Sequence, residues 1–261
     1  MRSVSVALVQ FSPGEDKLVN LAAIRSACET AAGAGAHLVV APEYSMFTAR
    51  RLDDRYRAAA EPLDGQFADG LRRVAADLGL VLAAGLAETS TNDSRISNTI
   101  LVTDGSRDLA RYRKIHLYDA FGFAESDVVS PGPTTEPALF TLSGLTFGVQ
   151  TCYDLRFPET TRRLAIAGAH AILLPAQWIP GPLKEDHWTT LVRARAIENT
   201  VFVCAADQAP PLGAGNSMIV DPMGVTLAAA GEAAGVVSAL VDETRIQEVR
   251  KQNPSLANRR L

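Results

Sequence analysis

Short apolar runs alternate with longer amphipathic stretches along the chain, and this alternation predicts strands interleaved with helices. Strands are predicted over residues 4–9, 37–41, 80–87, 96–102, 109–115, 138–141, 145–150, 171–175, 201–205, 217–220, 225–229 and 236–241. Helices are predicted over residues 16–33, 64–77, 159–168, 184–199 and 242–251. Since no linker, repeat or low-complexity segment interrupts them, the pattern predicts one α/β sandwich domain over residues 1–261.

The first helix shows how faces are assigned from the pattern. Leu18, Leu21, Ile24 and Cys28 recur at helical spacing and are expected to face the core. Two other segments carry weaker signals: residues 52–62 are polar and predict a loop with some helical character, and residues 92–94 (Asn-Asp-Ser) predict a turn. Residues 118–135 contain glycines and prolines without a clear period, and a loop of this length inside a compact domain is often functional.

Three polar residues each follow an apolar strand at its carboxyl end, namely Glu43, Lys114 and Cys152. Side chains at such positions gather at one edge of a sheet. There a carboxylate, an ammonium and a thiol would provide a base, an oxyanion stabiliser and a nucleophile. Taken singly, each also fits an ordinary structural role: a surface or capping carboxylate, a solvated lysine and a buried cysteine.

Composition narrows the class of function. Hydrophobic residues form 47% of the chain and charged residues 21%, as in ordinary globular proteins, and the net charge of −4 argues against nucleic acid as a partner. No apolar stretch approaches the ~18 residues of a membrane span. The three cysteines are far apart and form neither a disulfide framework nor a zinc pattern, so we expect a reducing, cytoplasmic setting.

Motifs of other enzyme classes are missing from the sequence. It contains no HExxH pair, P-loop, GxSxG elbow or GxGxxG fingerprint. The four histidines do not suggest a Cys–His dyad. We therefore expect no metal and no cofactor, and a small molecule rather than a nucleic acid or a membrane as the partner.

The segments around the three strand ends resemble the carbon–nitrogen hydrolases of the nitrilase superfamily almost from end to end. The matching segments are APEYSMF around Glu43, YRKIHL around Lys114 and TCYDLRFPE around Cys152. The intervals of 71 residues, from 43 to 114, and 38 residues, from 114 to 152, also fit the family. Further matches are GFAESD around Glu125, residues 187–199 and residues 215–224.

This resemblance implies a four-layer α-β-β-α sandwich and a Glu–Lys–Cys triad. Glu43 would be the general base, Cys152 would attack the amide carbon, and a thioester acyl-enzyme would follow. Lys114 and the backbone N–H of Tyr153 would hold the oxyanion. Glu125 resembles a second glutamate of the family amidases, which positions the substrate amide and Lys114; a carboxylate on the loop surface is its alternative.

Residues 153–159 (YDLRFPE) are most similar to the Nit-type amidases, such as the ω-amidases and the deaminated glutathione amidases. Their substrates carry a carboxylate, which Arg156 would bind; an ion pair of Arg156 with Asp154 or Glu159 explains that residue equally well. Asn216 departs from the histidine usual in these branches, and residues 206–214 form a short, proline-rich segment.

Other readings within and beyond the superfamily stay open at this point. A nitrilase or an N-carbamoyl hydrolase of the same superfamily is the nearest competitor. A non-catalytic binding relative is disfavoured because all three triad positions are occupied. The resemblance also implies a homodimer or a larger homo-oligomer.

Overall fold

Two six-stranded sheets form the centre of the molecule in the computed structural model, which describes residues 2–90 and 94–260. The first sheet has the order β12-β1-β2-β3-β4-β5 and the second the order β11-β10-β9-β8-β7-β6. The strands of the first sheet are β1 (Ser3–Gln10), β2 (Leu38–Val40), β3 (Val81–Thr89), β4 (Ile96–Thr103), β5 (Asp108–Arg113) and β12 (Gly235–Asp242). Those of the second are β6 (Leu139–Leu142), β7 (Leu145–Val149), β8 (Ala171–Ala176), β9 (Phe202–Asp207), β10 (Met218–Val220) and β11 (Thr226–Ala229).

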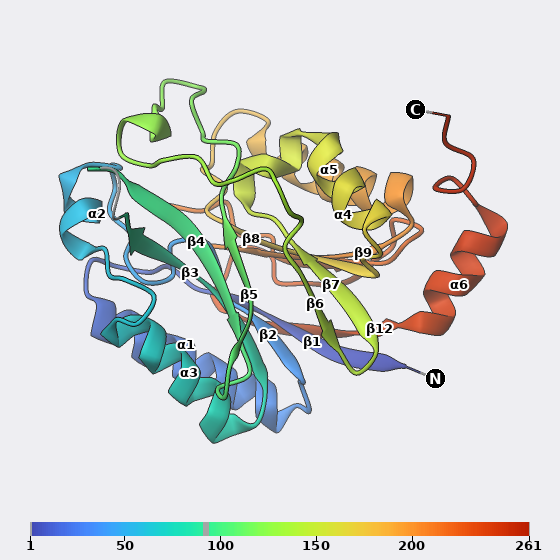
Figure 1. Ribbon diagram of the computed structural model, residues 1–261, viewed down its shortest axis with the longest axis horizontal. Helices are drawn as coiled ribbons and strands as arrows, with labels where there is room; N and C mark the ends of the chain where they lie inside the picture. The colour runs from blue at the N-terminus through green and yellow to red at the C-terminus, as the bar shows by residue number, and fades with distance from the viewer. Residues whose placement is uncertain (1, 91–93, 261) are drawn as a thin grey trace.

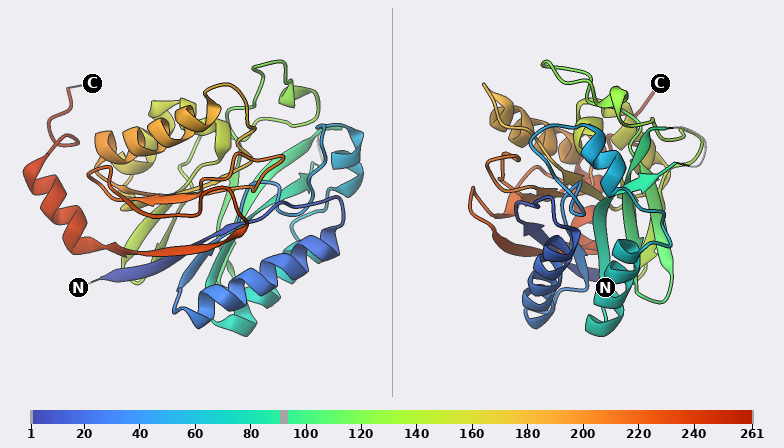
Figure 2. Two further views of the ribbon diagram at one scale, coloured as in Figure 1. Left: turned by 180° about the vertical axis from the view of Figure 1, so that it is seen from behind. Right: turned by 90° about the vertical axis from the view of Figure 1, so that its left-hand side faces the viewer.

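Helices cover the outer face of each sheet, so that the molecule has four layers (Figure 1). The helices are α1 (Lys17–Gly33), α2 (Asp54–Ala59), α3 (Gln66–Leu78), α4 (Pro158–Ile166), α5 (Lys184–Asn199) and α6 (Glu243–Gln252), with short 3₁₀ turns η1 (Glu125–Asp127) and η2 (Cys152–Arg156). The views from behind and from the side show α1 and α3 below the first sheet and α5 above the second (Figure 2). This arrangement confirms the predicted α-β-β-α sandwich.

The apolar faces of the two sheets pack on each other and form the central core. Val6 and Leu8 of β1 belong to the same buried cluster as Phe147 of β7 and Phe202 of β9. Burying one such side chain contributes about 1.5–3 kcal/mol, so this interface holds the two halves of the chain together. Sheet-to-sheet packing therefore also fixes how residues at the ends of different strands lie relative to one another.

Helix α1 corrects one predicted face. Asp16 caps the helix by accepting from the N–H groups of Leu18 and Val19, yet Leu18 is 71% exposed. Ile24 and Cys28 are buried as predicted, together with Asn20. The Asn20 amide is hydrogen-bonded to both backbone groups of Gly14 and to the carbonyl of Met46, and these three bonds set the rotation of the helix.

The weaker predictions had mixed outcomes. The helical character predicted within residues 52–62 corresponds to α2, which begins after the Asp53 cap. The turn predicted at residues 92–94 involves Asn92 and Asp93, which lie outside the described residues. No helix in residues 2–90 and 94–260 combines the length and apolarity needed to cross a bilayer.

Candidate active site

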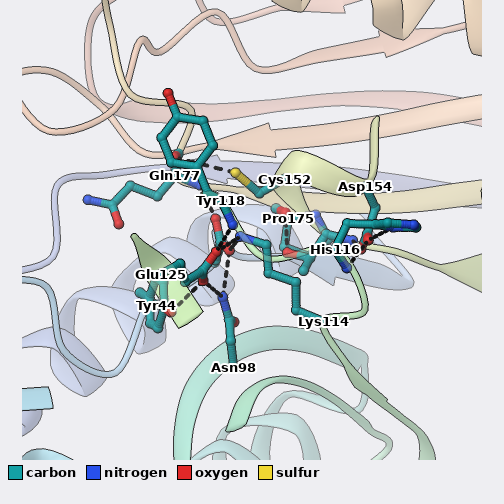
Figure 3. A network of polar contacts seen from close by, with 12 residues as sticks. Tyr44, Asn98, Lys114, His116, Tyr118, Glu125, Cys152, Asp154, Pro175 and Gln177 are labelled. Atoms are coloured by element: carbon teal, nitrogen blue, oxygen red, sulfur yellow. Dashed lines mark hydrogen bonds and ion pairs between the residues drawn. The ribbon is translucent and has the colours of Figure 1, made fainter. Parts of the chain in front are cut away.

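One cavity of about 550 Å³ is lined by the side chains predicted at the strand ends. Glu43 follows β2, Lys114 follows β5 and Cys152 follows β7, so the first two come from one sheet and the third from the other. Glu125 reaches the same cavity from η1, in the long loop after β5. Figure 3 shows Lys114, Glu125 and Cys152 converging at this point.

Glu43 is held by neighbours from both halves of the sandwich. Its carboxylate is 1% exposed, and Oε1 accepts from Lys114 Nζ at 2.9 Å and from Asn98 Nδ2 at 2.7 Å. Oε2 accepts from the backbone N–H of Gln177, which follows β8, at 2.7 Å. A Cβ at Gly85 of β3 would lie 2.7 Å from the Glu43 Cα, so this close approach requires glycine.

Lys114 bridges two carboxylates. Its ammonium, 2% exposed, lies 2.9 Å from Glu43 Oε1 and 2.8 Å from Glu125 Oε2. The Oε1 of Glu125 accepts from the hydroxyl of Tyr44 at 2.9 Å and from Asn98 at 3.2 Å. Burial opposes the charge of Lys114, but the carboxylates of Glu125 and Glu43 outweigh it and hold the pKa of the ammonium well above its ordinary value. Lys114 is therefore a permanent cation in this cavity.

Cys152 occupies a turn that few residues adopt. It follows β7 and opens η2 with a φ of +45°, in the left-handed region that is strained for a residue with a side chain. Its Sγ lies 3.5 Å from the Gln177 carbonyl oxygen. Burial raises the pKa of the Cys152 thiol well above its ordinary value, the Glu43 carboxylate raises it further, and Lys114 opposes these effects. These effects favour the neutral thiol form of Cys152.

Asp154 joins the segment after Lys114 to the turn at Cys152. Asp154 Oδ1 accepts from the backbone N–H of His116 at 3.0 Å and contacts its Nδ1 at 2.8 Å. Oδ2 accepts from the hydroxyl of Tyr112 at 2.6 Å and from the N–H of Thr151 at 3.0 Å. Thr151 and Asp154 form a capping box around η2, a pattern visible in the sequence as Thr-x-x-Asp.

Arg156 does not form the alternative ion pair considered for it. Within the described part of the chain it has no ion pair with Asp154, which binds His116, or with Glu159. Its guanidinium lies over the ring of Trp178, 4.6 Å from the centroid, and 3.5 Å from His187 Nδ1. Arg156 and Tyr153 line a second, smaller pocket that also touches Cys152.

Asn216 lies outside the lining of both pockets. It adopts a φ of +57°, its amide donates to the Ala214 carbonyl at 3.0 Å, and its own carbonyl accepts from the Trp188 indole at 2.9 Å. The proline-rich segment of residues 206–214 includes Asp207, whose carboxylate accepts from the N–H groups of Trp178 and Ala214. Burial raises the pKa of the Asp207 carboxyl well above its ordinary value.

Sequence reasoning missed several polar partners of the cluster. Asn98 of β4 and the backbone of Gln177 both bind Glu43, and Tyr44 binds Glu125. Of these, only Tyr44 stands inside a recognised segment, so no motif marks the other two. Among the described residues, no three His, Cys, Asp or Glu side chains are grouped so that they could hold a metal ion.

The chain is similar to known proteins over nearly its whole length. The model of the family described as carbon–nitrogen hydrolase matches residues 5–251. A hydrolase from Mycobacterium tuberculosis is 38% identical over 97% of this chain and 94% of its own, and a deaminated glutathione amidase from Escherichia coli O157:H7 is 41% identical over 77% and 76%. The crystal structure of Saccharomyces cerevisiae Nit3, described as a member of branch 10 of the nitrilase superfamily, superposes with a TM-score of 0.87 at 29% identity and covers 100% of this chain and 97% of its own.

Proposed function

The chain belongs to the carbon–nitrogen hydrolase family, in its Nit-type branch, and we propose that it is an amidase working through a Glu43–Lys114–Cys152 triad. The substrate is a small, carboxylate-bearing amide, which is converted to acid and ammonia. One observation carries this proposal: the Cys152 thiol, the Glu43 carboxylate and the Lys114 ammonium line the same cavity.

Acylation begins with proton transfer from the thiol. Glu43 accepts the proton of Cys152 as Sγ forms a bond with the amide carbon, and the carbonyl oxygen becomes an oxyanion. Lys114 and the backbone N–H of Tyr153 stabilise that oxyanion. Losing one donor of this kind typically costs about 3–4 kcal/mol of transition-state stabilisation.

The C–N bond breaks when the oxyanion collapses. The leaving nitrogen takes the proton held by Glu43 and departs as ammonia, which leaves a thioester on Cys152. A water molecule then gives a proton to Glu43 and attacks the thioester carbon. Cys152 leaves as the thiol, with the proton returned by Glu43, and the acid is released.

Glu125 acts in this scheme by positioning. It lies 2.8 Å from Lys114 Nζ and its other oxygen is fixed by Tyr44 and Asn98. It therefore keeps the ammonium directed toward the oxyanion and offers an acceptor to the N–H₂ group of the substrate. Its 4% exposure argues against the alternative of a carboxylate on the loop surface.

The proposal extends to the context of the enzyme. A curated relative is named deaminated glutathione amidase, and a substrate with a carboxylate gives Arg156 a partner. We propose that residues 1–261 act as one domain, that the protein assembles as a homodimer or a larger homo-oligomer, and that it works in the cytoplasm.

Ammonia release tests the reaction. A screen would compare ω-amides, deaminated glutathione, aliphatic amides, carbamoyl compounds and a small nitrile matched to its amide, with the acid product measured alongside. We expect ammonia from an amide and its loss in Cys152→Ala. Cys28→Ala and Cys204→Ala are matched controls, since both thiols are buried in the core away from the cavity, and they should keep the activity. Acid from the nitrile but not from the amide, or full activity in Cys152→Ala, would overturn the proposal.

A further inference from the structure

A second lysine shares a pocket with the cysteine, and Glu43 is not among the residues that line this pocket. Lys184 is the first residue of α5 and only 6% exposed. Its ammonium donates to the hydroxyl of Tyr118 at 2.6 Å and lies 4.8 Å from the ring centroid of Phe121. With Arg156 and Cys152 it lines the smaller pocket, whose volume is about 20 Å³.

Neither cation of this pocket is neutralised by the protein. In residues 2–90 and 94–260, no carboxylate lies within ion-pair distance of Lys184 or Arg156. The Nε of Arg156 is buried without a hydrogen-bond partner. Burial lowers the pKa of Lys184, and the nearby charge of Arg156 lowers it further.

A buried lysine beside a half-buried arginine, without an anion, is unfavourable in the empty site. Each loses hydration and repels the other, and aromatic rings offset only part of that cost. A ligand carboxylate between them would supply the missing charge through charge-assisted hydrogen bonds.

The two pockets also orient the substrate. Both are lined by Cys152, Tyr118 and Gln177, so they meet at the nucleophile. The larger one contains Glu43, which must deliver a proton to the leaving nitrogen, and the leaving group is therefore directed there. The acyl part of the substrate then extends toward Lys184 and Arg156.

We propose that Lys184 is a specificity-determining residue that, together with Arg156, binds a carboxylate at the far end of the acyl part of the substrate. This inference rests on the proposed amidase function. It adds a second cation to the substrate-binding site and an orientation for the substrate. Glu43 and Lys114 perform the chemistry, whereas Lys184 selects which acyl group reaches Cys152. The same contact holds the acyl group in place while it is bound to Cys152 as a thioester.

Substrate preference is the first test. Glutaramate, the monoamide of a dicarboxylic acid, would be compared with hexanamide, a neutral amide of similar length, in the full-length enzyme. We expect Lys184→Met to lower the ratio of kcat/KM for glutaramate to that for hexanamide by about 10- to 100-fold, the loss of one charge-assisted hydrogen bond. Lys184→Arg keeps a cation and should retain more of the ratio. An unchanged ratio in a folded Lys184→Met enzyme overturns the inference.

Lys251→Met serves as the matched control, because Lys251 is exposed on α6 and lines neither pocket. Both its kcat/KM values should equal those of the wild type. Circular dichroism and a melting curve establish that each variant is folded.

Ligand binding gives a readout that needs no turnover. Calorimetry would measure the Kd of glutarate for Cys152→Ala and for Cys152→Ala combined with Lys184→Met. A Kd raised about 10- to 100-fold in the second protein supports the subsite, and an equal Kd overturns it. Absence of ammonia release from every amide would instead refute the amidase proposal, so the two failures are distinguishable.

Discussion

Lys114 and Lys184 line two different pockets that share Cys152, and the protein surrounds them in opposite ways. Lys114 is in contact with two carboxylates, whereas Lys184 contacts a phenol and aromatic rings beside the guanidinium of Arg156. The surroundings of Lys114 raise the pKa of its ammonium, and those of Lys184 lower it.

The difference indicates that the groups around Lys114 are in position before the substrate arrives, whereas the site around Lys184 is completed by the substrate. Around Lys114 two carboxylates are already in contact with the ammonium, which favours a preorganised reaction centre. Around Lys184 one negative charge is lacking, so binding energy is gained only when an anionic ligand enters. In the proposed scheme the same residue type thus serves the reaction in one pocket and substrate selection in the other.

The largest effect is expected from Glu43→Gln, which removes the proposed general base from the cluster around Lys114. Glutamine preserves the shape and an acceptor for Asn98 but cannot take the thiol proton, so kcat should fall about 10²- to 10⁴-fold. Steady-state ammonia release measures this. The control is Glu29→Gln, at an exposed position on α1. Activity of Glu43→Gln within threefold of wild type would show that another group is the base.

Lys114→Met can be compared directly with Lys184→Met, because both substitutions replace an ammonium side chain with a neutral one. Removing the oxyanion donor should lower kcat about 10²- to 10³-fold for anionic and neutral amides alike. It also leaves Glu43 and Glu125 without their buried cation, which costs roughly 3–5 kcal/mol of unfolding free energy.

Urea unfolding of the two methionine variants completes this test. Lys184→Met removes an unpaired cation and should leave the free energy of unfolding unchanged or raised. Equal destabilisation by the two substitutions would contradict the contrast between the lysines.

The smallest effect is expected from pH. Lys184 loses its charge as pH rises through a pKa that lies below the ordinary value of 10.5, so the preference for glutaramate over hexanamide should decline in that range. Burial raises the pKa of Tyr118 to about 12, above the range of this test. The Glu185 charge opposes the lowering of the Lys184 pKa.

Ratios of kcat/KM between pH 7 and 10.5 measure this preference. Lys184→Arg is the control, since an arginine keeps its charge over the whole range and its ratio should stay flat. A wild-type ratio that is equally flat would show that the charge of Lys184 does not contribute.

The sequence was sufficient to predict the strand ends that carry Glu43, Lys114 and Cys152, because each follows a short apolar run. Their convergence in one cavity was a prediction of the family resemblance, and it depends on how two sheets pack. Asn98 and Gln177 could not be found in this way. They contact Glu43 across 55 and 134 residues of chain, through an amide and a backbone N–H that no local pattern marks.

Local patterns also failed where a polar side chain decided the packing. Leu18 fits the apolar period of α1, but the three hydrogen bonds of Asn20 rotate the helix and leave Leu18 exposed. For Arg156 the sequence left an ion pair and a ligand contact equally open. The structure favours the ligand contact, because Asp154 is already occupied by His116 and Tyr112.

The division of the site between two sheets has a consequence for the order of events on the ribosome. Glu43 and Lys114 emerge before Cys152, so the nascent chain has a base and an ammonium before it has a nucleophile. Strand β1 lies in the same sheet as the strands that precede Glu43 and Lys114, and it pairs with β12. The first sheet therefore stays open along one edge until residues 235–242 have been synthesised. The edge of the first sheet beside β1 is thus completed by a strand that is synthesised after Glu43, Lys114 and Cys152.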